Sequence, residues 1–228
     1  IASITIVVCL TVELVLITSA AAAETTSHFN VSSPAATAVW SAMASFITVL
    51  WFATMVLTVM FIRSPGVDQV MKRAFTWGLV VSVAGMGVAF LMTGPTAEQL
   101  ADFQGVAGAH TVGLEDGGPG IPLFGWSTVA GDLRVPHFVG LHALQLIPLA
   151  VFFLRTKISV TGVDFIGLGY LIVVGLLTAQ ALAGQSVVAT SPAFAAGIIA
   201  AIAVPLTAAR IRGIRAETEA ESEQPLPS

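Results

Sequence analysis

Six long runs of apolar residues, separated by more polar segments, dominate the sequence. They cover roughly residues 1–22, 38–62, 74–93, 136–154, 165–183 and 192–209. Each run is close to the roughly 20 residues that an α-helix needs to cross the hydrocarbon core of a bilayer. The short alternating segments typical of a membrane β-barrel are not visible in the pattern. We therefore expect an all-α integral membrane protein, a bundle of about six transmembrane helices.

The composition agrees with this interpretation. Hydrophobic residues make up 56% of the 228 residues and charged residues only 10%, whereas roughly 25% of the residues of a soluble domain are charged. The nine lysine and arginine residues are scattered along the chain, so the sequence has no basic cluster of the kind that binds nucleic acid. The expected surroundings are a lipid bilayer, without a nucleic-acid partner.

The basic residues predict the orientation, because nearly all of them fall in alternate connections. These connections contain Arg63, Lys72 and Arg73, then Arg155 and Lys157, and finally Arg210, Arg212 and Arg215. Arg134 is the one basic residue in the other three connections, 22–37, 94–135 and 184–191. Since basic loops stay in the cytoplasm, we expect a multi-pass protein of the cell membrane with both termini cytoplasmic.

Two terminal segments need separate interpretation. Residues 19–23, Ser-Ala-Ala-Ala-Ala, resemble a signal-peptide cleavage site, although we expect residues 1–22 to remain as the first helix. Residues 216–228 alternate acidic and small residues and have little apolar surface to bury, which predicts a disordered acidic cytoplasmic tail. The chain then divides into a transmembrane bundle, residues 1–215, and this tail.

The connection 94–135, between the third and fourth helices, is the longest. Loops beyond about 12–15 residues are usually either functional or disordered. This loop contains apolar residues, such as Phe103 and Trp126, that can be buried. Gly94-Pro95 and Gly117–Gly120 are strong turn signals. We expect a long ordered extracytoplasmic loop that caps the outer face of the bundle.

Most of the polar chemistry of the chain lies in or just after this loop. The candidate residues there are His110, Glu115, Asp116, Asp132, Arg134, His137, His142 and Gln145. Three imidazoles and a carboxylate suit zinc or another transition metal ion, whereas haem fits less well because the helices opposite lack histidine. The candidate metal ligands are His110, Asp132, His137 and His142. Asp116 and Glu115 are candidates for acid/base catalysis.

The fourth apolar run predicts where the deepest polar groups face. His142 lies more than one turn below His137, and Gln145 shares the face of His142. Pro148 interrupts the helical hydrogen bonds and frees the carbonyl of Leu144. Because hydrocarbon does not tolerate unpaired polar groups, we expect this face to point into the bundle.

Glu13 lies inside the first apolar run, near the middle of the membrane. A carboxylate there is costly unless it faces the bundle or a water-filled cavity. Glu13, Arg134 and Gln145 are therefore candidates for a substrate contact or a polar network. Polar residues are scarce toward the cytoplasmic side, which favours a site on one side of the membrane over a path through it.

Three interpretations of the polar cluster stay open at this point: a structural hydrogen-bond network, a metal site, and a metal-free substrate or proton site. The protein that carries it is expected to be an outward-facing membrane enzyme or redox protein that acts on a lipid-like or small substrate. The alternatives are a transporter or permease, and a structural subunit of a homo-oligomer or larger membrane complex.

Overall fold

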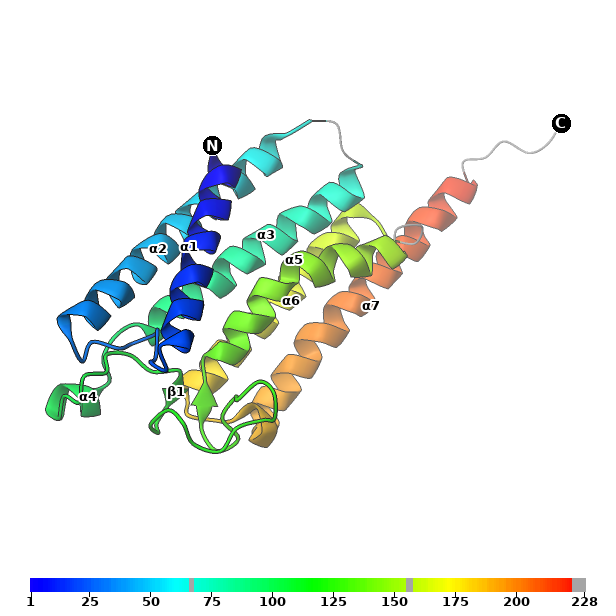
Figure 1. The fold of residues 1–228 in the computed structure, drawn as a ribbon. Coiled ribbons are helices and arrows are strands. Elements are labelled where there is room, and N and C mark those ends of the chain that lie inside the picture. The colour runs from blue at the N-terminus through cyan, green and yellow to red at the C-terminus, as the bar shows by residue number, and fades with distance from the viewer. Residues whose placement is uncertain (66–67, 155–157, 223–228) are drawn as a thin grey trace.

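The computed structural model describes residues 1–65, 68–154 and 158–222, and for 213–222 it gives the helix path alone. In this part of the chain six helices are long and apolar enough to cross a membrane, and they lie side by side as a bundle (Figure 1). They are α1 (Ala2–Ala22), α2 (Pro34–Arg63), α3 (Gln69–Val88), α5 (Arg134–Leu154), α6 (Val160–Leu182) and α7 (Pro192–Ser222). The prediction of an all-α membrane bundle is confirmed.

Several helices begin earlier than the apolar runs suggest, because polar side chains cap their first turns. Ser33 accepts a hydrogen bond from the backbone N–H of Ala36 at the start of α2. The Asp68 carboxylate and the Ser159 hydroxyl accept backbone N–H groups at the starts of α3 and α6. Such caps pair N–H groups that the helix itself leaves free. The first turns of these helices are thus fixed by polar residues that hydropathy overlooks.

Helix α7 extends through residues 216–222, part of the segment for which the sequence predicts a disordered tail. Residues 223–228 of that tail, and the basic residues Arg155 and Lys157, lie outside the described residues. Helix α7 packs against α6, while α1 packs against α2. Helix α3 is the central element, since it contacts α2, α5 and α6.

The most extensive contact between two described helices joins α3 to α5. A Cβ atom added to Gly85 would lie 2.6 Å from the Cα of Gly140, and one added to Gly78 would lie 2.9 Å from the Cα of Leu144. Between these positions the Ser82 hydroxyl donates a hydrogen bond to the carbonyl of Leu141 at 3.0 Å. Small residues that let two backbones touch are how helices associate in a bilayer, where no hydrophobic force drives them together.

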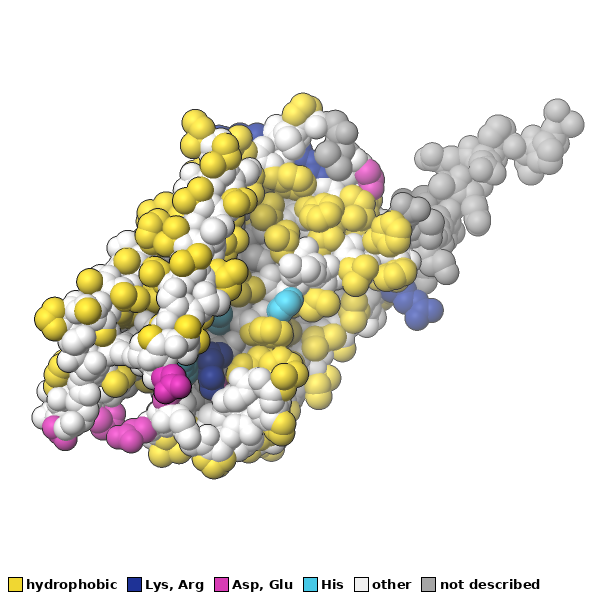
Figure 2. All heavy atoms as spheres, viewed as in Figure 1, with side chains coloured by type: hydrophobic (Ala, Val, Ile, Leu, Met, Phe, Trp, Pro, Cys, Tyr) yellow, Lys and Arg dark blue, Asp and Glu magenta, His cyan; other side chains and the backbone are white. Residues whose placement is uncertain are grey.

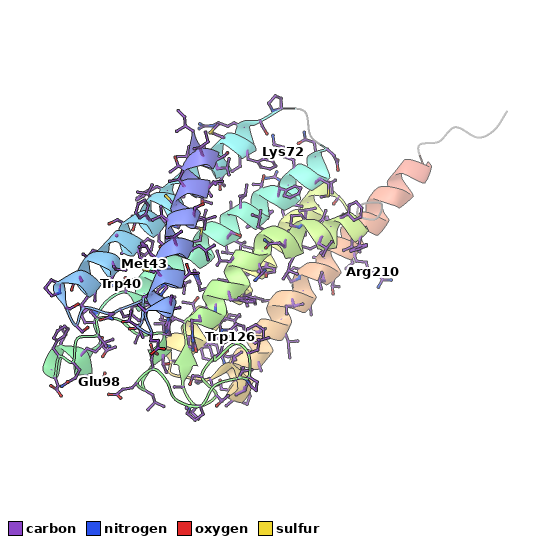
Figure 3. The ribbon with its side chains drawn as sticks, in the orientation of Figure 1. Trp40, Met43, Lys72, Glu98, Trp126 and Arg210 are labelled. Carbon is purple, nitrogen blue, oxygen red and sulfur yellow. The ribbon has the colours of Figure 1, made fainter. Side chains whose placement is uncertain are left out.

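The three longer connections between the spanning helices, 23–33, 89–133 and 183–191, gather at one end of the bundle, which we call the loop end (Figure 1). Its short elements are η1 (Ala89–Met92), α4 (Ala97–Ala101), β1 (Thr111–Val112), β2 (Gly131–Asp132) and η2 (Val187–Ala189). Strands β1 and β2 are antiparallel, with Thr111 opposite Asp132. Figure 3 shows Glu98 and Trp126 at the loop end and Lys72 at the opposite end.

The loop end is held by hydrogen bonds as well as by apolar burial. Trp126 is partly buried and stacks on Phe124, but Phe103 and Leu123 are exposed. The Gln99 side chain instead binds both the N–H and the C=O of Gly108, at 3.0 and 2.9 Å. Figure 2 shows the corresponding surface: hydrophobic side chains cover the helices, and most of the visible acidic side chains lie at the loop end.

The contact between α3 and α5 predicts different effects on stability for two glycine-to-alanine substitutions. Gly85→Ala places a methyl group in the backbone of α5, and overpacking of this kind costs about 1–3 kcal/mol. Gly175→Ala, in α6, adds the same group where nothing lies within 4 Å, so it should leave stability unchanged or raise it through helix propensity. Thermal unfolding in detergent measures both. Equal stabilities of the two variants would contradict this account of the packing.

Candidate functional site

An open pocket of about 440 Å³ lies at the loop end, between the last turns of α1 and the loops. Ile17 and Ala21 of α1 form one wall, and His28, His110 and Asp116 contribute the titratable groups. The two loops that build it are joined by backbone hydrogen bonds. Those from the N–H of Val31 to the carbonyl of Gly105 and from the N–H of Ala107 to that of Phe29 are both 2.9 Å long.

His110 is held in this pocket by the carboxylate of Asp116. The Nδ1 atom of His110 lies 3.1 Å from Oδ2 of Asp116. The same carboxylate accepts the backbone N–H groups of His110 at 2.9 Å and of Thr111 at 2.8 Å. Gly113 and Gly117, with φ angles of 88° and 94°, bring the chain back so that Asp116 faces the start of β1.

The surroundings of Asp116 decide its charge. Burial by itself raises the pKa of this carboxyl, but the hydrogen bonds from His110 and Thr111 outweigh burial and hold its pKa well below its usual range. Asp116 is therefore ionised at neutral pH and can only accept hydrogen bonds. It follows that the proton of a neutral His110 ring sits on Nδ1, and Nε2 is left as the basic atom.

His28 and Glu13 form a second pair next to this one. Nε2 of His28 lies 4.0 Å from Oε1 of Glu13, and its Nδ1 lies 2.9 Å from the hydroxyl oxygen of Ser27. Burial, and then the nearby His110, lower the pKa of His28. Glu13 is buried, and its Oε2 has no hydrogen-bond partner among the described residues.

Phe29 connects the two pairs. Its ring is buried, 4.8 Å from the ring of His110 and 6.1 Å from that of His28, measured between centroids. Its backbone has a φ of 61°, a left-handed conformation that is uncommon for a bulky residue. Sequence reasoning misses His28, although one signal was present: its connection, 22–37, is predicted on the same side of the membrane as the loop that contains His110.

The four candidate metal ligands do not come together. In the ranges that the structure describes, no group of three or more His, Cys, Asp and Glu side chains is arranged to hold a metal ion. The prediction of a metal site is thus not supported. A regular helix turns about 100° per residue, so His137 and His142, five residues apart, point in different directions. The other two candidate ligands have separate partners: His110 contacts Asp116, and Asp132 binds Arg134.

Asp132 and Arg134 join the two ends of a turn. The buried Asp132 carboxylate accepts the backbone N–H of Ser127 at 2.9 Å and the side chain of Arg134 at 2.7 Å. Arg134 also donates to the carbonyl of Gly125 at 2.7 Å. These contacts satisfy the hydrogen-bonding groups of a buried turn. These hydrogen bonds indicate that Asp132 and Arg134 have a structural role in this turn.

The two histidines of α5 have unlike surroundings. Nδ1 of His137 lies 2.8 Å from the carbonyl oxygen of Gly85, to which it donates. His142 is partly exposed, and its ring centroid lies 4.2 Å from that of Phe138. Gln145 is exposed. The expectation that the face of His142 and Gln145 points into the bundle is wrong, because the backbone contact with α3 fixes the rotation of α5 and turns this face outward.

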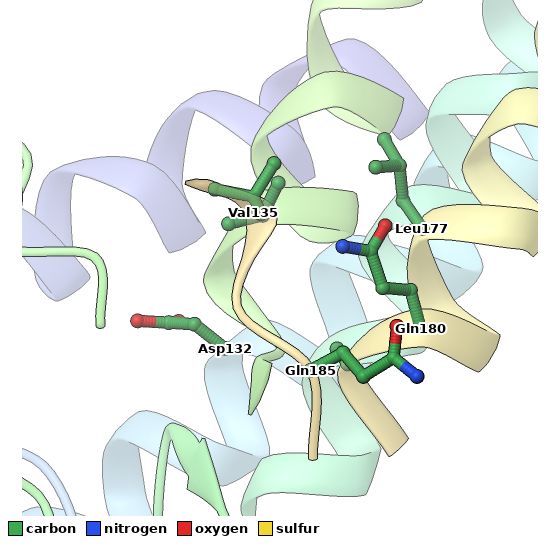
Figure 4. Close-up of a pocket in the computed structure, with 7 residues that line it drawn as sticks. Asp132, Val135, Leu177, Gln180 and Gln185 are labelled. Carbon is green, nitrogen blue, oxygen red and sulfur yellow. The ribbon is translucent and has the colours of Figure 1, made fainter. Parts of the chain in front are cut away.

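Glu115 is exposed, and none of its side-chain atoms makes a hydrogen bond with a described residue. Of the two candidate acid/base carboxylates, Asp116 alone therefore has a partner in the pocket. A second cavity, beside Asp132, Gln180 and Gln185 (Figure 4), measures about 10 Å³. Such a volume is no larger than a water molecule needs, so this cavity is too small to hold a substrate.

Comparison of the chain with models of protein families, with curated proteins and with solved structures found no match. The candidate site is the pocket that contains the His110–Asp116 pair, with Glu13 beside His28 at its edge.

The low pKa of Asp116 predicts how stability depends on pH. A carboxyl group whose pKa is lower in the folded than in the unfolded protein adds stability above its unfolded pKa of about 3.9, and loses that contribution as the pH falls. Asp116→Asn should therefore be less stable than the parent protein at pH 7, and the difference should shrink below about pH 4. Glu115→Gln is the control. Unfolding midpoints measured from pH 7 to pH 3 test this, and a difference independent of pH would contradict it.

Proposed function

We propose that the protein is a membrane enzyme with an outward-facing acid/base site, in which His110 is the general base and Asp116 orients it. The observation that carries the proposal is the 3.1 Å contact between His110 Nδ1 and the ionised Asp116 carboxylate, inside an open pocket of about 440 Å³. A carboxylate that fixes the tautomer of a histidine makes its other nitrogen available for proton transfer. Nε2 of His110 has no hydrogen-bond partner among the described residues.

The pocket walls suggest an amphiphilic substrate. Ile17, Ala21 and Val106 provide apolar surface, while Thr25 and Ser27 provide hydroxyl groups. The pocket lies where α1 reaches the loop end, so an apolar chain could remain along α1 in the bilayer while a polar group enters. A lipid-like molecule fits this arrangement better than a small ion. In this proposal His28 contacts the polar group of the substrate.

A transport function is the second candidate, and Glu13 favours it. This buried carboxylate lies nine residues before the end of α1, about 13 Å into the membrane at the helical rise of 1.5 Å per residue. Together with His28 it extends the polar groups inward from the pocket. Toward the opposite end of the bundle, the hydroxyl of the buried Thr58 donates its hydrogen bond to the carbonyl of Thr54 in its own helix. We therefore prefer a one-sided site to a continuous path.

The enzyme proposal predicts a change in the lipids that surround the protein. Purified protein in vesicles of phosphatidylglycerol and phosphatidylethanolamine should convert one of them to a product visible by mass spectrometry. His110→Ala should slow this conversion at least about 100-fold, since a general base contributes that much or more. Glu115→Gln should retain the rate. Unchanged lipids with the parent protein, or a full rate with His110→Ala, would contradict the proposal.

We also propose that the loop end is extracytoplasmic, because Arg63, Lys72 and Arg73 are at the opposite ends of α2 and α3. In a Cys9→Ala background, a membrane-impermeant thiol reagent added to intact cells should label Leu123→Cys, which is fully exposed. It should spare Ser64→Cys, at the end of α2, until the cells are permeabilised. Labelling of Ser64→Cys alone in intact cells would invert the orientation.

A further inference from the structure

One face of α5 is exposed along much of its length in the described structure. It contains Phe138, His142, Gln145 and Leu149, which are spaced four, three and four residues apart and so form a single stripe along the helix. Leu149 is 51% exposed, Phe138 is 39% exposed and Gln145 is also exposed. The opposite face of α5 is buried against α3 and α6.

The two polar residues of this stripe lack hydrogen-bond partners among the described residues. Neither His142 nor Gln145 makes a hydrogen bond with any residue that the structure describes. Gln145 lies eleven residues from the first and nine from the last residue of α5, so it is near the middle of the hydrocarbon. An amide there is costly when it faces lipid. Polar side chains within membrane helices almost always face protein or water.

We propose that this stripe is the interface of a parallel homodimer. Two copies related by a two-fold axis along the membrane normal place each residue opposite its own counterpart, at equal depth. A primary amide both donates and accepts hydrogen bonds, so Gln145 of one copy pairs with Gln145 of the other. A neutral imidazole is self-complementary in the same way. Hydrogen bonds between membrane helices contribute directly to their association.

The spacing and the neighbouring loop are compatible with this occupant. Intervals of three and four residues keep the stripe on one side of α5, as packing of two helices at about +20° requires. At the loop end, Phe138 continues into Phe124 and Trp126, whose ring centroids lie 5.9 and 5.4 Å from its own. Phe124 is exposed as well. These aromatic rings extend the apolar surface of the stripe beyond the helix.

Disulfide cross-linking of the full chain in vesicles tests the dimer. In a Cys9→Ala background, Leu149→Cys should form a cross-linked dimer on mild oxidation, because it faces its counterpart. The matched control is Leu206→Cys on α7, which is 47% exposed and lies at a similar distance along its helix from the loop end. No enrichment of the Leu149→Cys dimer over this control would overturn the proposal.

Gln145→Leu tests whether the amide is responsible. This substitution removes a polar group from the hydrocarbon, so the variant should fold, and its thermal unfolding checks that it does. Dimerisation measured by sedimentation in detergent should weaken about tenfold or more, in line with the loss of interhelical hydrogen bonds, and cross-linking through Leu149→Cys should fall with it. A parent protein that is monomeric, or a Gln145→Leu variant that associates equally well, would show that lipid or another protein covers this face.

Discussion

The structure depends on the close approach of α3 and α5. Gly85 and Gly140 bring the two backbones into contact, and the Ser82 hydroxyl bonds to α5 beside them. Because the two backbones meet at these small residues, the contact fixes the rotation of α5. That rotation presents His137 to the carbonyl of Gly85. His142 comes five residues later, about 140° farther around the helix, and is therefore turned to the outside.

Carboxylates organise the loop end in a comparable way. Asp132 and Asp116 each accept backbone N–H groups from the turns around them, and pairing such groups is obligatory wherever water is excluded. Asp132 also binds Arg134, so its role is complete within the turn. Asp116 binds His110 and faces the pocket. Two similar acidic residues thus differ in their partners, a guanidinium for Asp132 and an imidazole for Asp116.

The histidines illustrate the same separation of roles. His110 has a carboxylate partner, His137 a backbone carbonyl, and His142 an aromatic ring. The proposed acid/base site belongs to the pocket between α1 and the loops, whereas the proposed dimer interface belongs to α5. The two proposals use different residues and different physics, proton transfer in one and hydrogen bonding within hydrocarbon in the other. Either can fail without affecting the other.

The sequence by itself determined the six apolar spans, the connections between them, and the loop in which most of the polar chemistry lies, because hydrophobic length is a local property that a bilayer selects directly. The tertiary structure decided which polar residues meet. The bonds between the loops bring His28 and His110 to the same pocket, and the contact of Gly85 with Gly140 turns Gln145 outward. Both are contacts between segments distant in the chain, and helical periodicity gives the angle between two residues of one helix but not the direction in which that helix faces.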